Sequence, residues 1–464
     1  MLYLSDKVNA DAVAEVIKEC EEQGIHFRCV QVLRGGEPQL KMAFEPYDID
    51  APMHLYSLSK SFTSVAFGIC CDEGLITPES HLSEIFPDKM PENPSEEIKK
   101  MRFCDLLSMR SGHGVCALAK MRWSEDAIKA FFEQPIPNEP GTKFIYSTGA
   151  TCVCAAAAEK VTGRKLVDFL DEKLFSILEC EKPVWLECRD GQTLGGTGLM
   201  ISSETLTKFG LMLRNGGVYN GKRIVSEKYL RDATSVHADN SCNGTPDWVA
   251  GYGWQFWIND REGFRGDGAF GQLCVILPST DTVVTVMGEV GNMQNEMTMV
   301  YKLVDTMFDG KGDEKALDGL IKNLYSLKKS GDGFNKDVAF DVAENVCEIK
   351  NFRFYGEKLL HVVLETGYGR REFVCGNGEY ILNHFQGKCL SPTISQLDPA
   401  LYTVERVNVF AGYEKLGENR YLITLRHYDT PHVQRWEVDL DAGVVDIKVF
   451  VGDMIVKHFE KIQG

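Results

Sequence analysis

A change of sequence pattern well past the midpoint of the 464-residue chain constrains its fold more than any other feature. Upstream, some segments space their apolar residues as helices do and others alternate as strands do. Residues 310–313 (Gly-Lys-Gly-Asp) and 330–333 (Ser-Gly-Asp-Gly) then enclose a short charged stretch typical of a linker. Downstream of Val338 only strand patterns and turns remain, including a hairpin signal, Gly-Asn-Gly, at 376–378, as in an all-β barrel or sandwich. The predicted bounds are a first domain at 1–312, a linker at 313–333 and an all-β domain at 334–464.

Upstream of the linker, the patterns predict both strands and helices. An apolar hairpin is expected within residues 26–44, and two further strands are expected over 273–277 and 282–287. Residues 74–190 show mainly helical spacing interrupted by Pro and Gly breakers, which predicts a mostly helical region. Residues 251–257 (Gly-Tyr-Gly-Trp-Gln-Phe-Trp) are rich in aromatic side chains and are expected to form another strand.

The charge of the chain disfavours some classes of partner. The formal net charge is −17, so nucleic acid and anionic membranes would repel the chain. The N-terminal residues lack a basic region followed by an apolar core, and no apolar run is long enough to span a membrane. We therefore expect a cytoplasmic protein that acts on a small molecule, with no nucleic-acid or membrane partner. The sequence leaves the oligomeric state open.

Cysteine and histidine are numerous but form no metal-binding pattern. The 15 cysteines are scattered, many in apolar runs, and no spacing gives a paired Cys-x-x-Cys site. This usage is typical of reduced, buried thiols in a cytosolic protein. The 10 histidines show no metal spacing either, and His427 and His432, which flank Asp429, are expected at the surface. Neither a metal nor a cofactor is predicted.

The stretch best suited to catalysis is Ser-Leu-Ser-Lys at residues 57–60. Apolar residues recur at helical spacing after it, and Gly74 is a typical helix stop, so the stretch is expected to begin a helix. Residues three apart lie on one face of a helix, which would bring Ser57 Oγ and Lys60 Nζ together. A serine hydroxyl becomes a good nucleophile when a neighbouring base takes its proton, and a lysine with a lowered pKa can be that base.

The Ser-x-x-Lys spacing is not specific by itself. Ser326 and Lys329 have the same spacing in the linker, where we interpret them as part of a solvated helix. Ser57 could equally be an ordinary helix cap, because serine is a favoured capping residue. The interpretation of Ser57 as a nucleophile therefore depends on what lies downstream.

A second motif lies downstream, and with it the chain resembles a known family. Residues 140–148 (Pro-Gly-Thr-Lys-Phe-Ile-Tyr-Ser-Thr) resemble the Pro-Gly-x-x-x-x-Tyr-x-Asn segment of the serine β-lactamase-like family. That family includes class C β-lactamases, penicillin-binding proteins, esterases and D-amino-acid amidases. The resemblance runs from about residue 8 to 308 and includes four further stretches. These are residues 106–112, 195–199, 215–221 and 251–254.

The resemblance implies a fold and a set of catalytic roles. The fold would be α+β, with an antiparallel sheet flanked by helices and a mostly helical lobe beside it. Ser57 would be the acylated nucleophile, Lys60 the residue that activates it, and Tyr146 a general acid/base near both. A depressed pKa would suit Tyr146 to this role. The backbone N–H groups of Ser57 and Ala269 are the candidate oxyanion hole.

The third motif of the family, Lys-Thr-Gly or His-x-Gly, has Gly266-Asp267-Gly268 as its counterpart. The cation of the motif is missing, and an acid lies next to its expected place. Arg265 could replace it, but alternation along a strand would turn Arg265 to the other face. Without the cation, an efficient β-lactamase is not expected. A neutral ester, or an amide with a basic group near Asp267, is easier to accommodate.

The remaining candidates concern the substrate pocket. Thr148 stands where the family has Asn, and Gly268 would allow a close backbone approach. Trp254 is a further candidate to line the pocket, and His113 could reach the cleft.

The sequence therefore predicts a serine hydrolase that acts on a small ester or amide through an acyl-enzyme. A first alternative is a catalytically weak or inactive binding or regulatory protein, which the altered third motif favours. A second alternative is a penicillin-binding carboxypeptidase, which the absence of an export signal disfavours.

Overall fold

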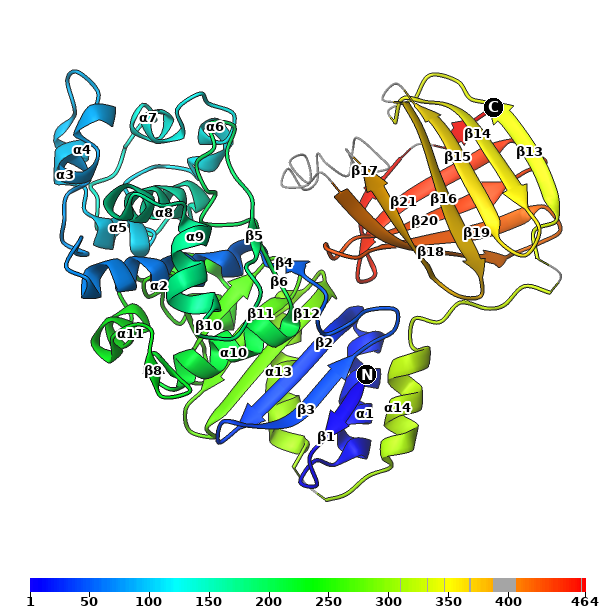
Figure 1. Cartoon of the computed structure of the whole chain (residues 1–464), viewed down its shortest axis with the longest axis horizontal. Coiled ribbons are helices and arrows are strands. Elements are labelled where there is room, and N and C mark those ends of the chain that lie inside the picture. Colours follow the sequence, from blue (N-terminus) through cyan, green and yellow to red (C-terminus); the bar gives the residue numbers. More distant parts are fainter. Residues whose placement is uncertain (309, 332, 346, 367–368, 387–405, 460) are drawn as a thin grey trace. The chain divides into compact units, whose positions relative to one another are not determined.

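The computed structural model confirms an α+β fold with a C-terminal all-β domain (Figure 1). Backbone contacts divide the chain into two compact units. The first comprises residues 1–29, 42–51 and 288–464, and the second comprises residues 30–41 and 52–287. The structure describes residues 1–308, 310–331, 333–345, 347–366, 369–386, 406–459 and 461–464. The predicted domain and linker bounds remain a prediction.

The main sheet contains the strand that carries the third motif. Among the described residues its order is β1 (Leu2–Leu4), β3 (Glu37–Ala43), β2 (Ile25–Arg34), β12 (Thr282–Val290), β11 (Gln272–Leu277), β10 (Phe264–Gly268) and β9 (Trp257–Ile258). Strands β9 to β12 pair antiparallel, with Cys274 opposite both Gly266 and Thr285. Strands β11 and β12 are buried along their whole length, as their Val, Leu and Ile content favours.

In the second unit, two packed helices form the support of the site. Helix α2 (Ser59–Asp72) is buried almost throughout and packs against α8 (Thr148–Thr162). The run of alanine at 155–158 keeps α8 slim enough for this packing, and Gly163 ends the helix in the left-handed region. Helices α3 to α9 gather in a lobe within residues 82–170 (Figure 1). The other helices of this unit are α3 (Leu82–Ile85), α4 (Glu96–Lys100), α5 (Phe103–Leu107), α6 (Leu118–Met121), α7 (Ala127–Phe132), α9 (Leu166–Leu170), α10 (Ser203–Arg214), α11 (Glu227–Ala233) and α12 (Pro246–Val249).

The first unit has its own helices and the C-terminal sheet. Helix α1 (Ala10–Glu22) packs against α13 (Met293–Thr306) and α14 (Glu314–Asn323). Side chains of Asn9 and Asp313 cap α1 and α14 by accepting hydrogen bonds from first-turn N–H groups.

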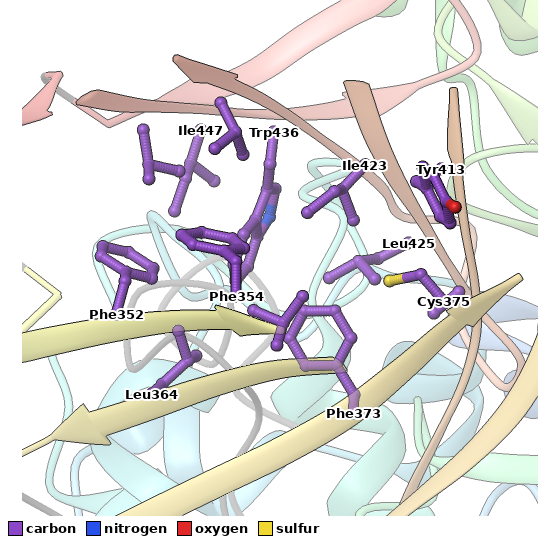
Figure 2. Close-up of a cluster of buried hydrophobic side chains, with 14 of the residues drawn as sticks. Phe352, Phe354, Leu364, Phe373, Cys375, Tyr413, Ile423, Leu425, Trp436 and Ile447 are labelled. Carbon is purple, nitrogen blue, oxygen red and sulfur yellow. The ribbon is translucent and has the colours of Figure 1, made fainter. Parts of the chain in front are cut away.

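The C-terminal sheet curls around an aromatic core (Figures 1 and 2). Phe352, Phe373 and Trp436 are all nearly fully buried, and both phenyl rings meet the Trp436 indole edge-on. The strand order is β13 (Lys336–Asp341), β14 (Ile349–Gly356), β15 (Leu360–Thr366), β16 (Gly369–Asn377), β18 (Arg406–Lys415), β19 (Arg420–His427), β20 (Val433–Asp439), β21 (Val444–Val451) and β22 (Met454–His458), with β17 (Ile381–Gln386) on β18 and β23 (Ile462–Gln463) on β21.

Two local predictions are wrong. The glycine-rich turn at 376–378 does not join a simple hairpin, because β16 and β17 both pair with β18, the former in parallel. Of residues 251–257, only Trp257 belongs to a regular strand. Gln255 has a φ of +68°, and its buried amide donates to the Leu106 and Leu107 carbonyls, so side-chain bonding overrides the strand pattern there.

The histidines predicted at the surface are buried instead. His427 and His432 are each 1% exposed. The Trp436 indole donates to Gln434 Oε1, so the Gln434 amide nitrogen donates to His427 Nε2. This order of bonds keeps His427 neutral, and burial lowers its pKa to about 3.

Candidate active site

Ser57 lies in a 3₁₀ turn, Tyr56–Leu58, directly before helix α2. The prediction that Ser57 begins or caps the helix is therefore wrong in detail, since α2 begins at Ser59. Tyr56 has a φ of +48°, which is strained for a bulky residue. Such strain is typical of sites where the backbone must present a neighbouring side chain in one direction. Ser57 is only half-buried, whereas the residues after it are buried.

Lys60 lies one turn further on and contacts Ser57. Its Nζ is 2.9 Å from Ser57 Oγ, 3.1 Å from Thr148 Oγ1 and 2.7 Å from the Gly196 carbonyl oxygen. The side chain is 1% exposed. Burial lowers the pKa of Lys60 to about 7, while Cys116 and Asp267 oppose that shift. Lys60 can therefore exchange a proton near neutral pH, which a lysine of ordinary pKa does not.

Two backbone features position the partners of Lys60. Thr148 is the first residue of α8, and the Ser147 side chain caps that helix by accepting from the Ala150 N–H. A Cβ at Gly196 would lie 2.8 Å from Thr148 Cγ2 and 2.9 Å from the Thr148 carbonyl oxygen, so only glycine fits. Sequence reasoning missed Gly196 as a lysine partner. The cluster of glycines at 195–198 was its only signal.

Tyr146 lies beside Lys60 and Ser57. The Lys60 nitrogen is 4.8 Å from the centre of the Tyr146 ring. Hydrogen bonding to Ser57 and Trp257 favours the ionised form of Tyr146, but it does not offset burial in the pKa. Burial raises the pKa of Tyr146 well above its usual value, and Asp267 and Cys116 raise it further. The expectation of a depressed pKa is therefore wrong, because burial of the phenol outweighs the hydrogen bonds that favour its ionised form. Tyr146 keeps its proton.

The end of β10 passes directly against the turn that holds Ser57. A Cβ at Gly268 would lie 2.1 Å from the Leu55 carbonyl oxygen and 3.1 Å from the Leu58 nitrogen. A Cβ at Gly266 would lie 2.9 Å from Ser61 Oγ. Both glycines therefore face the 3₁₀ turn and α2, and Ala269 follows in the turn that begins beyond β10. This approach brings the Ala269 backbone towards the Ser57 turn.

Asp267 and Arg265 share the opposite face of β10. Arg265 Nε donates to Asp267 Oδ2 at 2.9 Å, and the two side chains are 0% and 6% exposed. Arg265 also donates to Asn259 and to the Asp247 carbonyl, and its guanidinium lies 4.4 Å from the Trp248 ring centre. Burial raises the pKa of Asp267, while Arg265 opposes that rise.

Of the two tryptophans in this region, Trp257 lies at the site and Trp254 does not. The Trp257 ring stacks on Tyr146 with centroids 5.4 Å apart. The Trp254 ring instead stacks on His237 at 4.6 Å and contacts Tyr229. Trp254 was the predicted pocket residue, but the tryptophan at the site is Trp257, three residues further along the chain.

His113 is held away from the catalytic groups. Its Nδ1 bonds Ser111 Oγ and its Nε2 bonds the Phe131 carbonyl oxygen, both at 3.1 Å. Cys116, which sequence reasoning did not single out, is exposed and electrostatically coupled to Lys60. Burial opposes ionisation of this thiol, but the N–H groups of Leu118, Gly149 and Thr148 outweigh it and lower the pKa.

No metal site emerges from the described part of the chain. Within it, no group of three or more His, Cys, Asp or Glu residues is arranged to hold a metal ion. Helices there are also too short or too polar to cross a membrane.

Comparisons with known proteins identify the family of this chain. A family model described as Beta-lactamase matches residues 13–295. The chain therefore belongs to the Beta-lactamase family. The 6-aminohexanoate-dimer hydrolase of Paenarthrobacter ureafaciens is 26% identical over 304 residues, which are 60% of this chain and 76% of that protein.

Two solved structures share the fold. A family VIII carboxylesterase superposes with a TM-score of 0.52 and 16% identity, covering 66% of this chain and 99% of the esterase. The octameric penicillin-binding protein homologue from Pyrococcus abyssi gives 0.51 and 13%, covering 98% of this chain and 99% of the homologue. The second match includes the C-terminal all-β domain.

Proposed function

We propose that this protein is a serine hydrolase that cleaves a small ester or amide through an acyl-enzyme on Ser57. The observation that carries the proposal is the 2.9 Å contact between Ser57 Oγ and a buried lysine whose pKa is about 7. A nucleophile paired with a base that is half deprotonated at neutral pH is the arrangement that acyl transfer requires. Membership of a hydrolase family supports the same reaction class.

The hydrogen bonds of Lys60 indicate the direction of proton transfer. A neutral amine has two N–H groups and one lone pair. The Gly196 carbonyl can only accept, so it takes one N–H, and Thr148 Oγ1 can take the other. The lone pair is then directed at Ser57, whose O–H donates to it. In this state Lys60 is ready to take the Ser57 proton as Oγ attacks the substrate carbonyl.

Tyr146 is suited to the opposite transfer. Its raised pKa keeps the phenol protonated, so it can give a proton to the leaving alcohol or amine as the acyl-enzyme forms. Lys60 then passes the proton it took from Ser57 to the Tyr146 oxygen. Water attacks the acyl-enzyme ester, and the same groups move protons in the reverse order. The N–H groups of Ser57 and Ala269 would bind the oxyanion. No metal or cofactor takes part in this scheme.

The substrate is proposed only as a class. A relative is named 6-aminohexanoate-dimer hydrolase and a structural neighbour is named a carboxylesterase, and these names support an amide and an ester as candidate substrates. We place the reaction in the cytoplasm, and the free thiols throughout the described residues support a reducing compartment. The expected partner is a small molecule rather than nucleic acid or membrane.

The proposal is tested by the mass of the intact protein after treatment with a fluorophosphonate probe. We expect one adduct on the wild type and none on Ser57→Ala. The matched control is Ser326→Ala, because Ser326 has the same Ser-x-x-Lys spacing in an exposed stretch. Loss of the adduct in Ser57→Ala alone supports the proposal, and an adduct that survives in Ser57→Ala contradicts it.

A second candidate is a non-catalytic binding or regulatory protein. The observations that favour it are the missing cation of the third motif, with an acid, Asp267, next to its place, and Thr148 where the family has Asn. It predicts that no serine reacts with the probe although ligand binding survives in Ser57→Ala. The penicillin-binding carboxypeptidase alternative has in its favour the fold shared with a penicillin-binding protein homologue, and at 13% identity that likeness concerns the fold alone.

A further inference from the structure

The third motif differs from the family pattern by more than the loss of a cation. Gly266 and Gly268 face the Ser57 turn and α2, where a Cβ would collide with Leu55, Leu58 or Ser61. The other face of β10 carries Arg265 and Asp267. Trp257 pairs with Arg265 and stacks on Tyr146, so this face lies towards Tyr146. The cation of the motif is missing at Gly266, and an acid stands beside its place.

This acid is electrostatically linked to both proton-transfer residues. The Asp267 carboxylate raises the pKa of Lys60 and of Tyr146. The geometry agrees, because its partner Arg265 lies 5.8 Å from the centre of the Trp257 ring, which stacks on Tyr146. Asp267 is 7% exposed. Arg265 binds Oδ2 with its Nε, at 2.9 Å.

Arg265 is itself unavailable to an anionic substrate. Its Nε, Nη1 and Nη2 donate to Asp267, Asn259 and the Asp247 carbonyl, respectively. The guanidinium is covered by the Trp248 and Trp257 rings, 4.4 and 5.8 Å from their centres, and the residue is fully buried. The cation therefore orients Asp267 and does not replace the carboxylate-binding group of the family.

Resting on the hydrolase function proposed above, we propose that Asp267 is an ammonium-binding subsite, and that the substrate is an ester or amide with a free amino group near the scissile carbonyl. The ammonium would donate to the Asp267 carboxylate while Arg265 holds that carboxylate in place. A charge-assisted hydrogen bond of this kind is about twice as strong as a neutral one. A substrate carboxylate in the same place would be repelled.

The test compares three p-nitroanilides whose acyl groups match in size. These are the 3-aminopropanoyl, butanoyl and succinyl anilides, which are cationic, neutral and anionic. We expect wild-type kcat/KM to fall in that order, by about tenfold between the cationic and neutral anilides, which is about 1.4 kcal/mol. In Asp267→Asn the carboxamide oxygen can still accept from Arg265, and the preference should disappear. Asp267→His, which replaces the acid by a residue that can carry a positive charge, should favour the succinyl anilide.

A control separates local from long-range charge effects. Asp88→Asn removes the same charge from an exposed position and should leave the ranking unchanged. An equal wild-type rate for all three anilides, or a preference for the succinyl compound, would overturn the subsite even if Asp267→Asn failed to fold.

Failure of the subsite and failure of the hydrolase function remain distinguishable. A Ser57 adduct with fluorophosphonate but no preference for the cationic anilide rejects the subsite alone. If Ser57 does not react, 3-aminopropanamide and butanamide are compared by their effect on Tm. Stabilisation by the amine alone, lost in Asp267→Asn, would support the subsite in a non-catalytic protein, and equal shifts would reject it.

Discussion

Lys60 in one unit and Glu289 in the other are both fully buried ionisable side chains, but their surroundings are opposite. Glu289 accepts from Arg28 at 2.8 Å, from Arg426 at 3.1 Å and from the Tyr47 hydroxyl, and these cations lower its pKa to about 2 in spite of burial. Around Lys60 the hydrogen-bond acceptors are neutral oxygens.

The contrast shows what decides the state of a buried charge. Removing an ion from water disfavours its charged form, and only a nearby opposite charge offsets that cost. Glu289 has two such partners, so it stays ionised and stabilises the fold. Lys60 has only the more distant Asp267 and Cys116, so burial dominates and the amine is poised near neutral pH. A buried ionisable group without a close counter-ion is a candidate for chemistry.

The largest expected effect comes from removing the unpaired amine. Lys60→Met keeps the length of the side chain but leaves Ser57 without a base, so kcat/KM should fall by about 10²- to 10⁴-fold. In the wild type, kcat/KM should rise with pH below about 7 and level off above it, because neutral Lys60 is the active form. Both are measured by ester hydrolysis across pH 5–9.

The matched control for this variant is Lys329→Met, which changes the exposed lysine of the second Ser-x-x-Lys spacing. It should leave the rate and the pH profile unchanged. Full activity in Lys60→Met would show that another group activates Ser57, and the contrast with Glu289 would lose its functional meaning.

Breaking the paired charge should affect stability rather than chemistry. Glu289→Gln removes the charged carboxylate that the buried Arg28 and Arg426 both bind and should lower the free energy of unfolding by about 3–5 kcal/mol. The contribution of wild-type Glu289 is complete above a pH near its ordinary pKa of 4.5. It is lost as the pH falls towards about 2, because the folded-state pKa is depressed. Urea unfolding at pH 7 and at pH 3 measures both effects.

The control for Glu289 is an exposed ion pair of the same type. Asp337 accepts from Arg353, and the two side chains are 58% and 46% exposed. Asp337→Asn should change stability by less than about 1 kcal/mol. Equal losses in the two variants would mean that burial does not distinguish these pairs.

The parts of this molecule that sequence could predict are those set by local spacing. The three-residue interval between Ser57 and Lys60 placed their polar atoms in contact, as the 2.9 Å distance confirms. The apolar runs at 273–277 and 282–287 correspond to β11 and most of β12. In each case the decisive interaction lies within one element, or the pattern repeats along it.

The parts that sequence could not predict depend on contacts between distant segments. Gly196 is a partner of Lys60 through a carbonyl 136 residues away, and no side chain marks that role. Gln255 breaks the expected strand because Leu106 and Leu107 satisfy its amide. The burial of His427 follows from Gln434 and Trp436 on the neighbouring strand. Alternation places Arg265 and Asp267 on one face of β10, but it did not reveal that this face lies against Trp257, which stacks on Tyr146.

The smallest expected effect comes from removing a neutral hydrogen-bond donor, the Trp257 indole N–H, beside Tyr146. The Trp257 indole N–H can only donate, so a hydrogen bond from it to the Tyr146 oxygen would leave the Tyr146 proton directed at Ser57. Trp257→Phe keeps a ring to stack on Tyr146 but removes the N–H. Since one such bond contributes about 0.5–1.5 kcal/mol, kcat should fall by about 2- to 13-fold while KM stays constant. Trp254→Phe is the matched control, because its indole N–H is buried with no partner in the described residues and its ring lies against His237. It should leave kcat unchanged. Equal losses of kcat in the two variants would mean that the aromatic packing, and not a directed proton, is what Tyr146 requires.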